Sequence, residues 1–198
     1  MELKQRENEL NISFKRLSPE LCDDFLYYFD NIAFTDHEEW SACYCLESHL
    51  GDENDAIWDN RQARREKAGQ LIRQGIMQGY LVYDNDKIIG WCNAGDKKSY
   101  APVIGSSEHE TEDLSQSRVK VIYCLEIAPA YRGMGISHRI VERVCEDAKN
   151  DGFDYVEAYP FLDRSFEYQY HGPVHLYESH GFERLADKSD FCIMSKRL

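Results

Sequence analysis

The sequence has no apolar run that approaches the roughly 18 residues a membrane-spanning helix needs. Its opening segment, MELKQRENEL, alternates charged and polar side chains and lacks the apolar core of a secretory signal. With 42% hydrophobic and 30% charged residues, the composition excludes a disordered chain and an integral membrane protein. We therefore expect a cytoplasmic globular protein, and 198 residues suit a single domain.

Positive charge is scarce, because 23 Lys and Arg residues stand against 36 Asp and Glu residues, for a formal net charge of −13. Nucleic acids and anionic membranes bind basic surfaces, so we expect neither as a partner. The segment from Leu17 to Asn60 has no Lys or Arg at all. Its twelve acidic residues are Glu20, Asp23, Asp24, Asp30, Asp36, Glu38, Glu39, Glu47, Asp52, Glu53, Asp55 and Asp59. Such a segment either attracts a cationic ligand or forms a solvated face.

The cysteines show neither a disulfide framework nor a standard zinc site. Seven cysteines are an odd number and lie in apolar segments, as reduced core thiols do. Residues of metal-binding type occur at Cys43-x-Cys45 with His49, and at His171, His175 and His180, but their spacing matches no zinc finger. We predict that the protein holds no metal, and the role of Cys43 and Cys45 stays open.

Hydrophobic periodicity predicts alternating strands and helices, beginning with a strand at 11–17 and a helix that starts at Ser18-Pro19. Val119 to Ile127 is the most apolar strand, so we place it at the centre of the sheet. The other predicted elements are a loop or broken helix at 34–55, a helix at 61–78 with Ile76 on its apolar face and Gly79 at its end, a hairpin of 80–84 and 88–94, a polar loop at 97–118, a helix ending near Asn150, a strand at 155–159, a short helix at 173–180, and strands at 182–185 and 191–196.

Between the central strand and the helix that follows lies a glycine-containing turn, Arg132-Gly133-Met134-Gly135-Ile136-Ser137. Backbone N–H groups and the positive end of the helix dipole meet there, which favours binding of an anion such as phosphate. The glycines let the backbone approach the anion, and Arg132 adds positive charge. A dinucleotide fingerprint would need a third glycine where His138 stands, and no P-loop pattern is present.

Two segments together resemble the GNAT superfamily of acetyl-CoA-dependent N-acetyltransferases. LEIAPAYRGMGIS at 125–137 is similar to the family's acetyl-CoA motif, R/Q-x-x-G-x-G/A, with Gly133 and Gly135 at glycine positions and Arg132 in the basic run. LYESHGFERL at 176–185 is similar to a late helix–strand signature, in which the tyrosine at the position of Tyr177 is often the general acid. The resemblance covers residues 11–198.

The resemblance implies a single-domain α/β GNAT fold over residues 1–198: a mixed, mostly antiparallel twisted sheet of about six or seven strands with helices on both faces. It implies an acceptor-side half at 11–96, a polar loop at 97–118 and an acetyl-CoA-binding half at 119–198. The pantetheine arm of acetyl-CoA is expected between the central strand and strand 155–159. The implied contacts are Ile127 and Ala128 for the thioester, and Arg132, Gly133, Met134, Gly135, Ile136 and Ser137 for the pyrophosphate.

Two residues are candidates for acid–base chemistry. Glu126 lies near the end of the apolar central strand, where a carboxylate costs free energy unless it is paired or functional. It is our candidate general base, acting through a water, and the alternative is a salt-bridged or solvent-reaching acid. The resemblance makes Tyr177 the acid for the departing thiolate, and the alternative is a tyrosine that packs the short helix on the sheet.

We therefore predict an N-acetyltransferase that transfers the acetyl group of acetyl-CoA to a primary amine by direct attack. The acidic segment favours a cationic small molecule or peptide as acceptor, and Trp40, Tyr44 and Trp58 within it could box an amine by cation–π contacts. The alternative is a non-catalytic module that binds or senses acyl-CoA. The resemblance also allows a homodimer.

Overall fold

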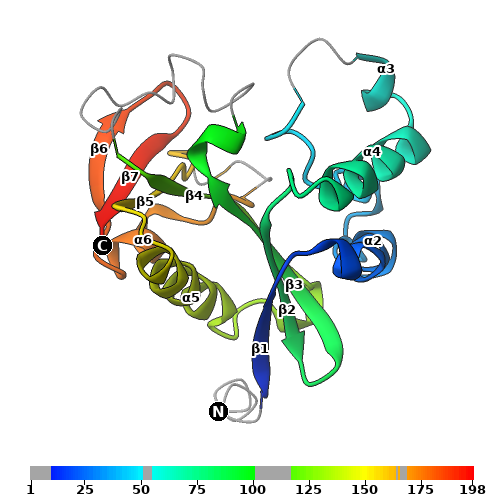
Figure 1. Cartoon of the computed structure of the whole chain (residues 1–198), viewed down its shortest axis with the longest axis horizontal. Coiled ribbons are helices and arrows are strands. Elements are labelled where there is room, and N and C mark those ends of the chain that lie inside the picture. The colour runs from blue at the N-terminus through cyan, green and yellow to red at the C-terminus, as the bar shows by residue number, and fades with distance from the viewer. Residues whose placement is uncertain (1–9, 51–54, 101–116, 164, 166–168) are drawn as a thin grey trace.

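The computed structural model describes the chain except residues 1–9, 51–54, 101–116, 164 and 166–168. In this part of the chain, seven strands form one sheet in the order β1-β2-β3-β4-β5-β7-β6 (Figure 1). Their bounds are β1 Ile12–Arg16, β2 Gly79–Asp84, β3 Lys87–Asp96, β4 Val119–Ile127, β5 Tyr155–Ala158, β6 Glu183–Asp187 and β7 Cys192–Arg197. Only β4 and β5 pair in parallel. The predicted mixed, mostly antiparallel sheet with a central 119–127 strand is confirmed.

Helices cover both faces of the sheet (Figure 1). The α-helices are α2 Cys22–Asn31, α3 Asp55–Trp58, α4 Arg61–Arg73, α5 Ile136–Asn150 and α6 Val174–Glu178. Short 3₁₀ helices occur at η1 Pro19–Leu21, η2 Glu38–Trp40, η3 Lys97–Tyr100 and η5 Pro129–Tyr131. No helix within the described ranges is long and apolar enough to cross a membrane.

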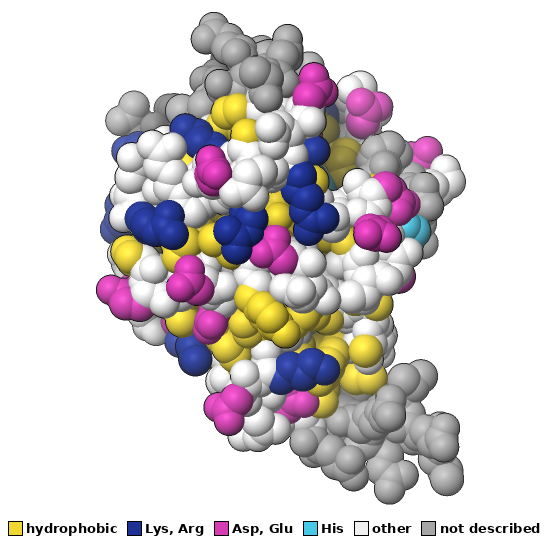
Figure 2. Space-filling model, turned by 90° about the vertical axis from the view of Figure 1, so that its right-hand side faces the viewer, with side chains coloured by type: hydrophobic (Ala, Val, Ile, Leu, Met, Phe, Trp, Pro, Cys, Tyr) yellow, Lys and Arg dark blue, Asp and Glu magenta, His cyan; other side chains and the backbone are white. Residues whose placement is uncertain are grey.

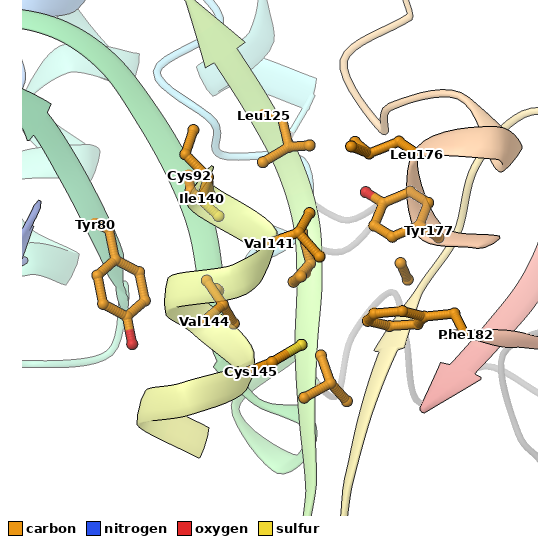
Figure 3. Packing of buried hydrophobic residues seen from close by; sticks show 14 of the residues in the cluster. Tyr80, Cys92, Leu125, Ile140, Val141, Val144, Cys145, Leu176, Tyr177 and Phe182 are labelled. Carbon is orange, nitrogen blue, oxygen red and sulfur yellow. The ribbon is translucent and has the colours of Figure 1, made fainter. Parts of the chain in front are cut away.

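The alternation of side chains along β2 explains why helices pack on both faces of the sheet. Tyr80 and Val82 point into the cluster that packs against α5 and α6, whereas Leu81 and Tyr83 point into the cluster that packs against α2 and α4. Because both faces bury apolar side chains, β2 is apolar at nearly every position. Figure 3 shows the first cluster, with Val141, Val144 and Cys145 of α5 packed against the sheet.

The helix predicted at 61–78 is wrong at its C-terminal end, because α4 ends at Arg73. Gly75 has a left-handed φ of 70°, a conformation that stops a helix at low cost only for glycine. Gly79, predicted to end the helix, is instead the first residue of β2. Ile76 is consequently 40% exposed and does not belong to a buried helical stripe.

Candidate active site

The site forms where β4 and β5 separate. Their parallel pairing runs from Val119–Tyr155 to Ile122–Ala158, while β4 continues to Ile127 beside β3 alone. A register shift opposite Asn93 and Ala94 places a bulge in this part of the β3–β4 ladder. Past Ile122, one edge of β4 is therefore no longer paired with β5, and its backbone groups face the gap.

Register decides which amides of β4 face this gap. The N–H of Ala128 donates to Ile89 O at 2.9 Å, so Ala128 and, by alternation, Glu126 are bonded to β3. The N–H groups of Leu125 and Ile127 then point to the other side. The N–H of Leu125 donates to Tyr170 O at 2.6 Å. The predicted thioester contacts are thus not equivalent: the amide of Ile127 faces the gap, whereas that of Ala128 is engaged in the sheet.

The glycine turn lies directly before α5. Gly133 and Gly135 have φ values of 76° and 70°, and Gly135 is the N-cap of the helix. A Cβ on Gly133 would meet no atom within 4 Å, so the backbone is open to a ligand there. Counted from Arg132, the small positions of R/Q-x-x-G-x-G/A fall on Gly135 and Ser137, which corrects our assignment of them to Gly133 and Gly135, and Ser137 departs from the usual Gly or Ala.

Met134 and Ile136 of this turn have buried side chains, with 8% and 1% exposure, which pack in the core beneath α5. Only their backbone groups can face a ligand. From Gly133 to Ile136, the turn can therefore meet a ligand only through its backbone, because its side chains either are absent, as in glycine, or are buried in the core.

A pocket of about 290 Å³ lies beside the turn and the end of β4. Its walls come from four segments of the chain. They are His37 and Trp40 at η2, Leu125, Glu126 and Ile127 of β4, Arg132 and Ser137 near the glycine turn, and Gln169, Tyr170, Gly172, Pro173 and Leu176 at and before α6. The pocket thus joins the gap in the sheet, the glycine turn and the segment before α6.

Glu126 is the buried acid of this pocket. Its side chain is 1% exposed, and its Oε2 has no hydrogen-bond partner. Burial raises the pKa of Glu126 to about 9, and Arg132 opposes this shift only in part. Glu126 is therefore protonated at neutral pH, and once it loses its proton it is a much stronger base than an ordinary carboxylate.

The sequence led us to expect the charge of Arg132 at the glycine turn. In the structure, its guanidinium instead makes its hydrogen bonds to other parts of the chain. Its Nε donates to Ile127 O at 2.9 Å, its Nη1 to Asp36 Oδ2 at 2.5 Å, and its Nη2 to Glu126 Oε1 at 3.3 Å. The guanidinium therefore connects the end of β4 with the segment between α2 and η2.

Tyr177 is fully buried and does not line the pocket. Its hydroxyl donates to His171 O at 2.6 Å and lies 3.1 Å from where a Cβ on Gly172 would be. Figure 3 shows the ring of Tyr177 beside Leu176, with its hydroxyl directed toward β4. Burial raises the pKa of Tyr177 well above its usual value, so the hydroxyl keeps its proton. Gly172, which does line the pocket, is next to this hydroxyl.

The predicted aromatic box does not form. Tyr44 is buried and donates to Asp30 at 2.6 Å, and the ring of Trp58 lies 5.9 Å from the Arg64 guanidinium. Trp40 alone reaches the pocket, where its ring stacks on His37 at 3.7 Å. All seven cysteines are free thiols, and no group of three or more metal-binding side chains comes together among the described residues.

The acidic segment is partly neutralised by residues outside it. Asp30 is paired with Arg61 and Arg65 of α4, and Asp36 with Arg132. The face that carries α2 and α4 accordingly shows basic side chains among its acidic ones (Figure 2). Asp52 and Glu53 lie outside the described residues.

Two features of the site have no clear signal in the sequence. The amide of Leu125 faces the gap because of the β3–β4 register, which is a property of the folded sheet. Asp36 reaches Arg132 across 96 positions of sequence. Its only sequence signal is its place in a segment without Lys or Arg.

Comparison with known proteins identifies the family of this arrangement. A model of the acetyltransferase (GNAT) family matches residues 19–182. No curated protein sequence matches the chain.

Solved structures with the same fold cover almost the whole chain. A polyamine N-acetyltransferase from Drosophila melanogaster, which forms N-acetylagmatine, superposes with a TM-score of 0.57 at 11% identity, covering 95% of this chain and 99% of the other. PaiA N-acetyltransferase from Thermoplasma acidophilum in complex with coenzyme A gives 0.55 at 18% identity, with 96% and 100% covered. An acetyltransferase from Thermus thermophilus gives 0.53 at 14% identity, with 96% and 98% covered.

Proposed function

Since this chain belongs to the GNAT acetyltransferase family, we propose that it transfers the acetyl group of acetyl-CoA to a primary amine by direct attack on the thioester. The observation that carries the proposal is the buried, partly unpartnered carboxyl group of Glu126 in a pocket that also reaches the glycine turn. One pocket thus offers a base for the amine and a backbone site for the phosphates of the acetyl donor.

The backbone from Arg132 to Ser137 would hold the pyrophosphate of acetyl-CoA. Open space at Gly133 and the N-terminal amides of α5 support this assignment, because a phosphate needs close approach to N–H groups. Gly135 caps the helix, and Met134 and Ile136 would contribute through their backbones alone. The amide of Ile127, facing the gap, would bind near the thioester, with Ala128 only as its neighbour in the sheet.

Glu126 would take the proton that the acceptor must lose. An alkylammonium group has a pKa near that of lysine, about 10.4. Because burial raises the pKa of Glu126 to about 9, transfer of a proton from the ammonium to this carboxylate is nearly balanced. The neutral amine nitrogen then bonds to the thioester carbon, releases its extra proton to solvent, and the carbon–sulfur bond breaks, with no covalent enzyme intermediate.

Tyr177 would supply the hydrogen bond for the departing thiolate. Its hydroxyl keeps its proton, and it is separated from the pocket by Gly172. This role requires the hydroxyl to exchange its bond to His171 O for one to the leaving sulfur. As the carbon–sulfur bond breaks, the hydroxyl passes its proton to the sulfur, coenzyme A leaves as the thiol, and a proton from solvent restores the tyrosine.

We further propose that the acceptor arrives as a cation. The acceptor side of the pocket is formed by His37 and Trp40, which belong to the acidic stretch between Leu17 and Asn60. Glu38 and Glu39 lie exposed on η2 beside the wall, so they can draw in a positively charged group. The stacked rings of His37 and Trp40 offer a flat surface for its carbon chain.

The test is incubation of the purified protein with acetyl-CoA and a panel of amines: diamines, arylalkylamines, amino acids and peptides with a free N-terminus. Release of free thiol and the mass of the product are measured together. We expect an acetylated amine whose formation needs Glu126. Tight coenzyme A binding without acetylation of any amine would instead identify a non-catalytic acyl-CoA-binding module.

A further inference from the structure

Arg132 shares one guanidinium between two carboxyl groups of very different surroundings. Asp36 is 37% exposed and lies 2.5 Å from Nη1, whereas Glu126 is 1% exposed and lies 3.3 Å from Nη2. The exposed acid therefore has the closer contact, and the buried acid has the longer one. An ion pair usually forms most tightly where the carboxylate is ionised, so the charge of Arg132 is balanced mainly by Asp36.

The other groups that face Glu126 do not replace this missing charge. The hydroxyl of Tyr28, from α2, donates to the backbone oxygen of Glu126 at 3.0 Å and does not touch its carboxyl group. The further titratable or charged groups around it are Tyr170, Cys43, Cys45, Cys124, His37, Asp36 and Arg132. Tyrosine and cysteine bring no positive charge, so Arg132 is the permanent cation among these described neighbours.

We propose that Asp36 is a positioning residue for the base: by holding the guanidinium of Arg132, it leaves Glu126 without a full counter-charge and keeps that carboxylate basic enough to deprotonate an ammonium group. This inference rests on the proposed function, because it gives Asp36 a part in the acetyl transfer assigned to Glu126. It also explains why an acid of the segment between α2 and η2 reaches across to the end of β4.

Two substitutions should move the titration of Glu126 in opposite directions. In Asp36→Asn, Arg132 loses its closer partner and turns its charge fully to Glu126, and a direct repulsion from Asp36 also disappears. The midpoint for Glu126 should then fall by about 1–2 pH units. In Arg132→Gln, the opposing cation among the described neighbours is gone, and the midpoint should rise. Arg132→Lys retains a charge without the planar fork, and its midpoint should lie between those of Arg132→Gln and the wild type.

The experiment is a ¹³C NMR titration of the full-length protein with labelled glutamate side chains, in which Glu126→Gln identifies the Glu126 signal. Asp30→Asn is the matched control, because it breaks another acid–arginine pair of the same acidic segment, at Arg65, without touching Glu126. We expect a lower midpoint in Asp36→Asn, a higher one in Arg132→Gln and no movement in Asp30→Asn. An unmoved midpoint in folded Asp36→Asn would overturn the inference.

The same variants are then assayed for acetyl transfer over pH 6–10. With Asp36→Asn, the rising acidic limb of kcat/KM should begin at lower pH, and its plateau should fall several-fold because the carboxylate is a weaker base. A purely structural role for Asp36 would lower kcat/KM at every pH without moving the limb. If no amine is acetylated but the NMR midpoints move as expected, the proposed function fails and the electrostatic role of Asp36 stands.

Discussion

Two neighbouring parts of the pocket are built in opposite ways. The glycine turn before α5 uses backbone groups from one continuous run of residues, and its glycines adopt left-handed φ values. The proposed acid–base cluster uses the side chains of Asp36, Glu126 and Arg132, in which Asp36 comes from a distant part of the sequence. The comparison teaches that a candidate site made of backbone groups can be predicted from a short motif, whereas a side-chain cluster depends on the whole fold. Substitutions should therefore damage acetyl-CoA binding at the turn and chemistry at the cluster.

The largest effect is expected for Glu126→Gln. Removing a general base typically costs about 10²–10⁴-fold in rate, so kcat/KM should fall by that factor while coenzyme A affinity stays within about twofold. In the wild type, kcat/KM should rise with pH up to about 9, as Glu126 loses its proton. Glu146→Gln, at an exposed position of α5, is the control and should retain full activity. A Glu126→Gln enzyme as fast as the wild type would remove this residue from the mechanism.

A somewhat smaller effect is expected for Tyr177→Phe, with kcat reduced about 10²-fold by loss of the hydrogen bond to the leaving sulfur. The variant also loses the buried bond to His171 O, which costs about 1 kcal/mol of stability. Tyr100→Phe is the matched control for that cost. The buried hydroxyl of Tyr100 donates a hydrogen bond of 2.6 Å to Asn93 Oδ1, and Tyr100 does not line the pocket. Equal kcat values for the two variants, measured at saturating substrates, would reduce Tyr177 to a packing residue.

Gly135→Val should weaken coenzyme A binding by about tenfold or more, since about 1.4 kcal/mol of lost contact corresponds to a factor of ten. Gly75→Val is a closely matched control, because both glycines have a φ of 70° and both substitutions bring the same backbone strain. Calorimetry should show the loss only for Gly135→Val, with similar thermal destabilisation in the two variants. Unchanged affinity in a folded Gly135→Val protein would mean that the phosphate site lies elsewhere.

The smallest effect concerns ionic strength. Exposed charges are screened over about 8 Å at physiological salt, so the KM of a cationic acceptor should rise a few-fold between low and high salt while kcat changes little. A neutral amino acid tested in parallel should show no such dependence. If cationic and neutral acceptors respond alike, the acidic segment is a solvated face without a role in recruitment.

The local sequence pattern was sufficient to predict an element wherever the apolar residues of that element alone determine how it is buried. In α5, apolar residues at Ile136, Ile140, Val144 and Ala148 recur at helical spacing, and all four are buried. The bounds of β4 and its central place in the sheet are likewise as predicted. In both cases strong apolar periodicity over many residues leaves only one face, or one place in the sheet, that buries the side chains.

Sequence pattern was insufficient where a backbone conformation or a distant partner decides the outcome. Ile76 and Met77 extend the apolar pattern of α4, but left-handed Gly75 ends the helix before them. Arg132 lies in the turn that we predicted to bind phosphate, yet its side chain pairs with an acid 96 positions away. The β3–β4 register directs the amide of Leu125 rather than that of Ala128 to the gap. The last two outcomes cannot be deduced from neighbours in the chain, whereas Gly75 is a local signal that competes with the apolar pattern.

We assign acetyl-CoA binding to the glycine turn and chemistry to the side-chain cluster. The most direct test of this assignment is single-turnover acetyl transfer by Gly135→Val and Glu126→Gln at increasing acetyl-CoA concentration. Saturation should restore the rate of Gly135→Val to near that of the wild type, because its chemistry is intact and only binding is weaker. The same concentrations should leave Glu126→Gln slow by about 10²-fold or more, because its base is missing. A Gly135→Val enzyme that stays equally slow at saturation, or a Glu126→Gln enzyme that recovers, would contradict the account.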